Sequence, residues 1–118
     1  MKYQTSISGI GELALELYRE SGSLVLFDDT APPELQEISV LHQSAPLKED
    51  VQEGDELILA DRIYRVKKVG SEANHTLKTQ GHCTLVFDPH GTDFLPGQIF
   101  LEGDEIPRFS QGDLLAIR

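Results

Sequence analysis

Histidine is the residue type in this chain best suited to chemistry at neutral pH, because its unperturbed pKa lies close to 7. The chain contains four histidines, at positions 42, 75, 82 and 90. A neutral imidazole nitrogen can accept a phosphoryl group or move a proton. His42 ends the apolar run 38–42 and is followed by a polar stretch. We therefore predict that His42 lies at the end of a strand, with its side chain at the mouth of a pocket.

His82 is the second candidate, because it opens the strand-like run 82–87 directly after Gly81. A glycine allows a close backbone approach at this point. On neighbouring strands, one histidine can hold a phosphoryl group while the other donates a hydrogen bond to it. Residue type alone leaves a purely structural role open for both. His75 and His90 lie in polar segments, and we assign neither a role.

Motifs for nucleotides and metals are missing from the sequence. It has no Gly-x-x-x-x-Gly-Lys-Ser/Thr run, and Gly9 and Gly11 form only a lone Gly-Ile-Gly, which is typical of a turn or bulge. No cysteines and histidines cluster at zinc-binding spacings. We predict neither a cofactor nor a metal. Cys83, the single cysteine, is predicted to be a small buried residue, and the pair Asp28 and Asp29 is predicted to be solvated.

Hydrophobic patterning predicts many short strands separated by Gly, Pro and Asp. The predicted helical segments are one turn at 31–35 and a short helix at 71–80, capped by Ser71 and stopped by Gly81. Segment 11–22 fits helix and strand equally well and ends at Gly22. The predicted strands are 2–10, 23–27, 38–42, 56–60, 63–67, 82–87, 98–101 and 113–117. This order predicts an all-β fold, a small barrel or barrel-like sandwich of about six to eight strands with minor helical turns.

Size and charge narrow the classes of function. A chain of 118 residues fits one domain, spanning 1–118. No apolar run approaches the about 20 residues of a membrane helix, and the start lacks the apolar core of a secretory signal, so we expect a cytoplasmic protein without membrane insertion. A net charge of −10 disfavours nucleic acid and favours transient docking of a basic protein. Val40 and Leu41 are predicted to contribute to the docking patch.

The order of several short segments resembles one known family over nearly the whole chain. The family is the glucitol/sorbitol-specific enzyme IIA component of the phosphoenolpyruvate-dependent sugar phosphotransferase system. The segment Gly-His-x-Thr-Leu-x-Phe-Asp and a histidine shortly after Glu-Leu-x-Glu carry most of the resemblance. The matching residues are Tyr3, Gln4, Thr5, Ala31, Pro32, Glu34, Leu35, Leu41, His42, Leu47, Lys48, Val69, Gly70, Ser71, Ala73, Leu77, Gly81, His82, Thr84, Leu85, Phe87, Asp88, Pro96 and Gly97.

This resemblance implies an enzyme, a phosphotransferase component that works through a phosphohistidine. It implies that His42 takes the phosphoryl group at Nε2 from the phosphohistidine of the general carrier HPr. His42 would then pass the group to a cysteine of the cognate IIB component, which works with the membrane component IIC. His82 matches the Gly-His segment, and we predict that it hydrogen-bonds to the phosphoryl group.

One departure from the family pattern and one alternative function remain to be considered. Family members can carry further Cys or His residues around the active histidine, whereas this chain has Leu41, Gln43 and Ser44 there, so these neighbours are not expected to be essential donors. The alternative class of function is a non-catalytic β-barrel that binds a ligand or partner, in which both histidines are structural and the acidic surface gives solubility. The sugar and the oligomeric state are left open by the sequence.

Overall fold

The computed structural model describes residues 1–87 and 93–118. The strands are β1 (Tyr3–Ile10), β2 (Ser23–Asp28), β3 (Ser39–His42), β4 (Glu56–Leu59), β5 (Arg62–Val69), β6 (Cys83–Phe87), β7 (Gln98–Glu102) and β8 (Leu114–Ile117). The helices are α1 (Ala14–Ser21), α2 (Pro33–Gln36) and α3 (Ala73–Gln80). Each predicted strand matches one of these strands to within two residues at either end, so these predictions are confirmed.

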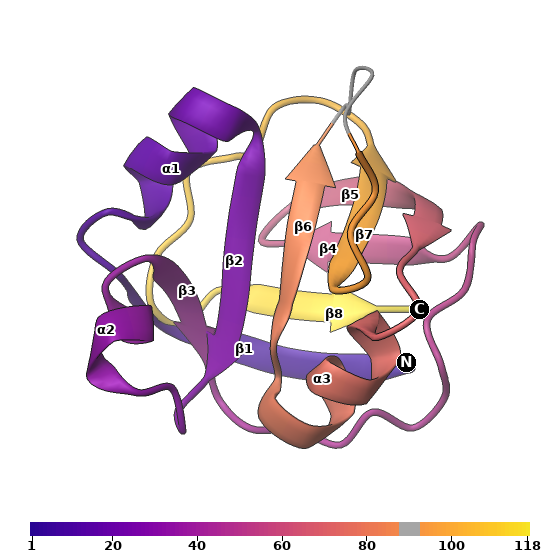
Figure 1. Cartoon of the computed structure of the whole chain (residues 1–118), viewed down its shortest axis with the longest axis horizontal. Helices are drawn as coiled ribbons and strands as arrows, with labels where there is room; N and C mark the ends of the chain where they lie inside the picture. The colour runs from indigo at the N-terminus through magenta and orange to yellow at the C-terminus, as the bar shows by residue number, and fades with distance from the viewer. Residues whose placement is uncertain (88–92) are drawn as a thin grey trace.

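The strands of the described residues close into a barrel in the order β1-β3-β2-β6-β7-β5-β4-β8 (Figure 1). The pairs β2–β3 and β6–β7 are parallel, and the other neighbouring strands are antiparallel. Closure leaves no unpaired sheet edge and surrounds a core of aliphatic side chains, among them Leu24, Leu57, Leu85 and Leu101, which are completely buried. The predicted barrel is confirmed, and the barrel-like sandwich is not the architecture observed.

Strand β2 is an apolar run because it is covered on both sides. Leu24, Leu26 and Phe27 are buried, and the strand pairs with β3 on one side and β6 on the other. A strand inside a closed barrel with helices outside it loses the usual alternation of apolar and polar residues. This pairing sets Asp28 directly opposite His42 at the ends of β2 and β3.

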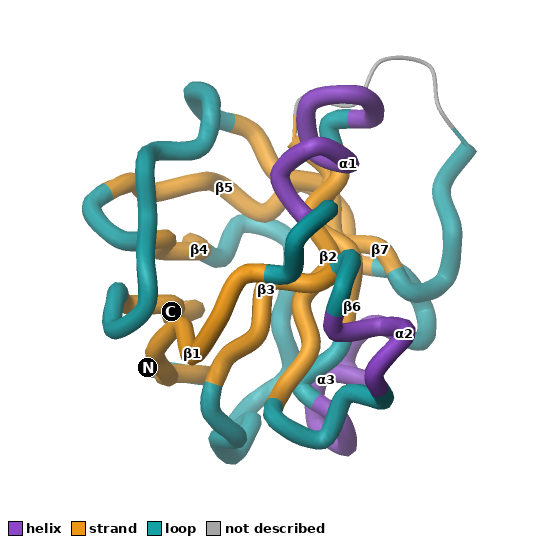
Figure 2. The backbone as a smooth tube through the Cα atoms, turned by 90° about the vertical axis from the view of Figure 1, so that its left-hand side faces the viewer, coloured by secondary structure: helices purple, strands orange, loops and turns teal. Residues whose placement is uncertain are grey.

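The ambiguous segment 11–22 forms helix α1, which ends at Gly22 in the left-handed conformation (φ 72°). Helix α3 ends in the same way at Gly81 (φ 58°), as expected where a residue without Cβ closes a helix. The predicted cap at Ser71 is wrong, because α3 begins two residues later and Glu72 occupies the capping position without a side-chain hydrogen bond. Figure 2 shows α2 and α3 at the end of the molecule opposite α1.

The predicted hairpin at 56–67 is confirmed as β4 and β5 joined by a tight turn. Ala60 in that turn has a positive φ of 53°, which is uncommon for a residue other than glycine. No helix in the described part of the chain is long and apolar enough to cross a membrane.

Candidate functional site

His42 lies inside the barrel end formed by β1, β2 and β3. It is the last residue of β3 and pairs with Ile7 of β1 and Asp28 of β2. Its side chain is 0% exposed. The predicted position at the end of a strand is therefore confirmed, whereas the prediction that the side chain sits at a pocket mouth is wrong. The reason is that the segment after α3 folds back over the imidazole ring.

Both ring nitrogens of His42 face backbone carbonyl oxygens. Nδ1 lies 2.9 Å from the carbonyl oxygen of Gln43, and Nε2 lies 2.8 Å from that of Gly81. A carbonyl oxygen only accepts hydrogen bonds, so a neutral ring, which carries one N–H, satisfies one of these contacts and turns a lone pair toward the other. In this closed arrangement, neither nitrogen presents a free lone pair to solvent.

Gly81 makes the close approach to His42 possible. A Cβ at this position would lie 2.6 Å from Cε1 of His42 and 2.8 Å from Cβ of Asp28, and the φ of 58° also disfavours other residues. The backbone N–H of Gly81 donates to the Leu77 carbonyl, 3.0 Å away. The C-terminal turn of α3 therefore acts as a cover over Nε2 of His42.

His82 is half-buried beside this cover, whereas His42 is completely buried. Nδ1 of His82 lies 2.9 Å from the Leu26 carbonyl oxygen and donates a hydrogen to it. The ring stacks on Phe27, with centroids 4.4 Å apart and an interplanar angle of 27°. The hydroxyl of Thr76 donates to the His82 carbonyl at 2.6 Å. These contacts fix the ring and the tautomer, so that the lone pair of a neutral His82 is at Nε2.

Asp28 is an acidic group that sequence reasoning placed wrongly. It was predicted to be solvated, but it is 6% exposed because β2 carries it to the covered barrel end. Its Oδ1 accepts hydrogen bonds from the backbone N–H of Thr30 at 2.9 Å and from the Thr30 hydroxyl at 2.5 Å. The only sequence signal for its burial was its position directly after an apolar run. Asp28 brings a carboxylate next to the covered histidine.

A buried tyrosine that contacts His42 was not predicted as a site residue. The ring of Tyr3 meets that of His42 edge to face, with centroids 5.8 Å apart. Its hydroxyl is buried and has no hydrogen-bond partner among the described residues, which costs about 1–3 kcal/mol. Cys83 is buried as predicted, and burial raises the pKa of its thiol to about 12.

The other predictions from the sequence concern two further histidines and the docking patch. His75 is exposed on α3, and His90 lies outside the described residues. Val40 is completely buried in the core, so its predicted place in an exposed docking patch is wrong, while Leu41 is partly exposed. Side chains that alternate along β3 point to opposite faces, which explains the difference between these neighbours.

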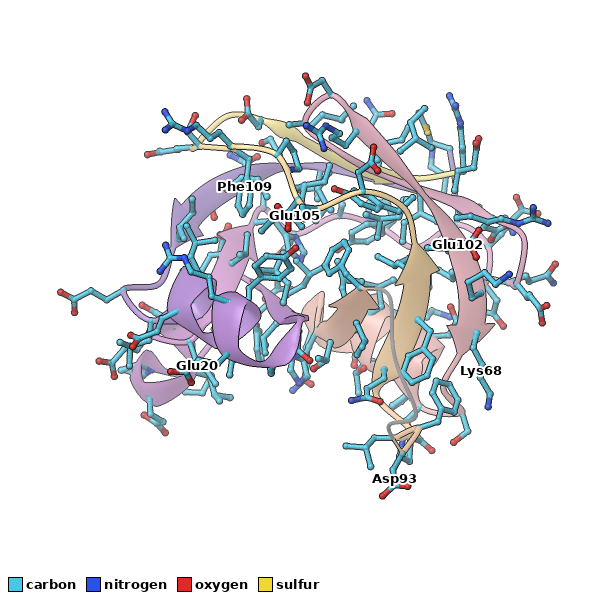
Figure 3. The ribbon with its side chains drawn as sticks, turned by 90° about the horizontal axis from the view of Figure 1, so that it is seen from above. Glu20, Lys68, Asp93, Glu102, Glu105 and Phe109 are labelled. Carbon is cyan, nitrogen blue, oxygen red and sulfur yellow. The ribbon has the colours of Figure 1, made fainter. Side chains whose placement is uncertain are left out.

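A groove of about 960 Å³ lies at another part of the molecule, between α1 and the loop 105–110. Figure 3 shows Glu105 and Phe109 on that loop, which passes beside α1. The groove has an apolar floor that includes Leu15, Tyr18 and Ile106, and neither His42 nor His82 lines it. Across residues 1–87 and 93–118, no three His, Cys, Asp or Glu side chains are grouped so that they could hold a metal ion.

The geometry defines a class of protein, a small closed mixed β-barrel with an imidazole site at one end. Two histidines that are 40 positions apart in the sequence form this site. The two rings are linked through the Gly81 carbonyl and the peptide that follows it.

Comparisons with known proteins identify the family. Residues 2–116 match the family model of the "PTS system glucitol/sorbitol-specific IIA component". The chain is 32% identical over 113 residues to the glucitol/sorbitol-specific EIIA components of Escherichia coli (strain K12) and of Shigella flexneri, covering 96% of this chain and 91% of each relative. A crystal structure of a PTS system IIA component from Enterococcus faecalis V583 is similar, with a TM-score of 0.85 and 27% identity over 96% of this chain and 97% of that one.

The chain belongs to the family of glucitol/sorbitol-specific IIA components of the phosphotransferase system. It is thus a component of a phosphotransferase system and a phosphoryl carrier in sugar uptake, as the sequence resemblance predicted.

Proposed function

We propose that His42 is the phosphoryl acceptor of this carrier, through Nε2, with HPr as the donor and a cysteine of the cognate IIB component as the recipient, in the cytoplasm. The observation that carries this proposal is that the two motif histidines, His42 and His82, are brought to the same barrel end. Nε2 of His42 and the backbone just before His82 are 2.8 Å apart.

The chemistry needs one specific tautomer of His42. The proton must be on Nδ1, which then donates to the Gln43 carbonyl 2.9 Å away, so that the lone pair is on Nε2. That lone pair attacks phosphorus as the N–P bond of the donor phosphohistidine breaks and its electron pair returns to the donor nitrogen. In the closed arrangement, the Gly81 carbonyl occupies the place of the incoming group. The cover must therefore move before transfer.

His82 serves as a hydrogen-bond donor to the phosphoryl oxygens in this proposal. Its Nδ1 is already committed to the Leu26 carbonyl, so a hydrogen bond to phosphate must come from Nε2. That nitrogen carries a hydrogen when the ring is protonated, and a charge-assisted hydrogen bond to a dianionic group is about twice as strong as a neutral one. The stack on Phe27 holds the ring in place.

The test is phosphorylation with phosphoenolpyruvate, enzyme I and HPr, followed by intact mass at neutral or alkaline pH, because phosphohistidine is acid-labile. His42→Gln and His82→Gln are compared, with His75→Gln on the exposed face of α3 as the control. Glutamine retains an N–H donor for the carbonyls around position 42. We expect no phosphoryl group on His42→Gln, slower labelling of His82→Gln, and wild-type labelling of the control.

Labelling of His42→Gln but not of His82→Gln would reassign the acceptor to His82, whose Nε2 lone pair is free in the closed arrangement. No labelling of the wild type would contradict the proposal and leave both histidines without a role as acceptor.

A further inference from the structure

The Tyr3 hydroxyl is unusual among the buried polar groups. Of all buried side-chain nitrogen and oxygen atoms in the described residues, it alone lacks a hydrogen-bond partner. The side chain is 2% exposed, and its aromatic ring belongs to the barrel core. A phenylalanine would fill the same space without burying an unpaired hydroxyl. Packing therefore explains the ring of Tyr3 but not its oxygen.

The position of Tyr3 ties this hydroxyl to the histidine site. Tyr3 and Ile7 are four residues apart on β1, so their side chains share a face, and Ile7 pairs with His42. The Tyr3 ring stands edge to face against the imidazole, at an interplanar angle of 87°. No other described aromatic ring stacks with His42.

The surroundings of Tyr3 keep its hydroxyl protonated. Burial, and after it the negative charge of Asp28, raise the pKa of Tyr3 above its ordinary value. Asp28 faces His42 across β2 and β3, so its field acts on both side chains. A neutral phenol is a hydrogen-bond donor, and in the closed arrangement that donor is unused.

We propose that Tyr3 is a catalytic residue, whose hydroxyl donates a hydrogen bond to the phosphoryl group while the bond between phosphorus and His42 forms. The inference rests on the proposed function. Once the Gly81 carbonyl has moved away, phosphorus bonds to Nε2 of His42 while the donor N–P bond breaks. The Tyr3 O–H gives a hydrogen bond to a phosphoryl oxygen and transfers no proton.

An unpaired donor suits this task better than a paired one. A donor that is free in the resting state loses no existing hydrogen bond when charge arrives, so its whole interaction favours the transition state and the phosphorylated state. The site is largely shielded from water. A hydrogen bond to a charged group is stronger in such a site than in water. The orphan hydroxyl and the covered histidine are then parts of one site.

The test compares Tyr3→Phe with Tyr64→Phe. Tyr64 is the matched control, because it is also buried in the barrel (1% exposed) and its hydroxyl donates to the Glu105 carbonyl at 3.0 Å. We expect the rate of phosphoryl transfer from phospho-HPr to fall about tenfold to a hundredfold in Tyr3→Phe, as for the loss of one hydrogen bond to a charged group, while its urea midpoint stays equal or rises. Tyr64→Phe should do the reverse, with a lower midpoint and an unchanged rate.

The inference would be overturned if Tyr3→Phe accepted the phosphoryl group at the wild-type rate. It would also be overturned if both variants were slowed equally. If the wild type takes no phosphoryl group at all, the proposed function fails and this inference fails with it. If Tyr3→Phe does not fold, an NMR measurement on the wild-type protein tests the inference instead. With ¹³Cζ-labelled tyrosine, phosphorylation should shift the Tyr3 resonance and leave that of Tyr64 in place, and an unmoved Tyr3 resonance would overturn the inference.

Discussion

At the scale of single residues, burial decides which side chains are chemically available. His42 and Cys83 are both completely or almost completely buried, but they differ in their surroundings. His42 is surrounded by polar partners, namely the two carbonyls and, across the strand pair, Asp28. Burial alone raises the pKa of Cys83. The structure therefore assigns Cys83 to the core and leaves His42 as the candidate for chemistry.

Cys83 gives a prediction about the pH dependence of stability. Its pKa is raised from 9.0 to about 12 by burial, so above pH 9 the unfolded state loses the thiol proton and the folded state retains it. The unfolded state then binds fewer protons, and the free energy of unfolding falls as pH rises. The stability linked to Cys83 is full below pH 9 and is lost between pH 9 and about 12.

Urea unfolding of the wild type and Cys83→Ala at pH 8 and pH 11 measures this effect. Between these pH values, the wild type should lose about 2–3 kcal/mol more than Cys83→Ala, from two pH units at 1.36 kcal/mol each. Tyrosine ionisation acts on both proteins and cancels in the difference. Equal losses in the two proteins would show that the buried thiol does not resist ionisation.

At the scale of elements, the C-terminal turn of α3 governs access to the site. The turn places a carbonyl, rather than solvent, against Nε2 of His42. It needs glycine for two separate reasons: the left-handed φ of residue 81, and the absence of a Cβ beside the imidazole. Gly22, at the end of α1, shares the first requirement only, because the nearest atom to an added Cβ there is 3.5 Å away.

Gly81→Ala and Gly22→Ala therefore form a matched pair. Each forces alanine into the left-handed region, at a cost of about 1–2 kcal/mol. Gly81→Ala must in addition displace the turn or the His42 ring. Diethyl pyrocarbonate, which reacts with accessible unprotonated imidazole nitrogens, should modify His42 slowly in the wild type and in Gly22→Ala, and quickly in Gly81→Ala.

The exposed His75 provides the internal reference for this reactivity, read out by peptide mass. Modification of His42 in the wild type as fast as that of His75 would contradict the closed arrangement. Equal protection of His42 in both glycine variants would show that residue 81 does not control access.

The sequence predicted the strands and helices better than it predicted the site around His42. The strands were predictable because apolar runs such as 23–27 and turn residues between them are local signals. The helical state of 11–22 was not predictable, because its apolar residues fit both the helix and the strand periodicity. The packing of α1 on β2 decides between the two. The burial of His42 and Asp28 depends on Gly81, which is 39 residues away from His42, and no local pattern reports such a contact.

At the scale of the whole molecule, charge is the property that partners meet first. The chain has 20 acidic and 10 basic residues, for a net charge of −10. A carrier that must bind a donor and a recipient in turn needs fast, weak association, and long-range attraction raises the encounter rate without adding buried area. We expect the acidic surface to steer a basic docking face of the donor.

Salt dependence tests this expectation. The rate constant for transfer from phospho-HPr, measured at low protein concentration, should fall several-fold when the ionic strength is raised from about 0.01 M to about 0.15 M, because the Debye length shrinks from about 30 Å to about 8 Å. The rate at saturating phospho-HPr should change much less. A second-order rate constant that stays constant with salt would show that net charge does not steer docking.

The most direct test of the central claim is to observe the histidine ring nitrogens during phosphorylation. Long-range ¹H–¹⁵N spectra of the ¹⁵N-histidine protein identify which ring, and which nitrogen of it, carries phosphorus. We predict that phosphoenolpyruvate, enzyme I and HPr convert Nε2 of His42 to the phosphorylated form while Nδ1 retains its proton. Phosphorylation of the His82 ring, with the His42 nitrogens unchanged, would contradict the account.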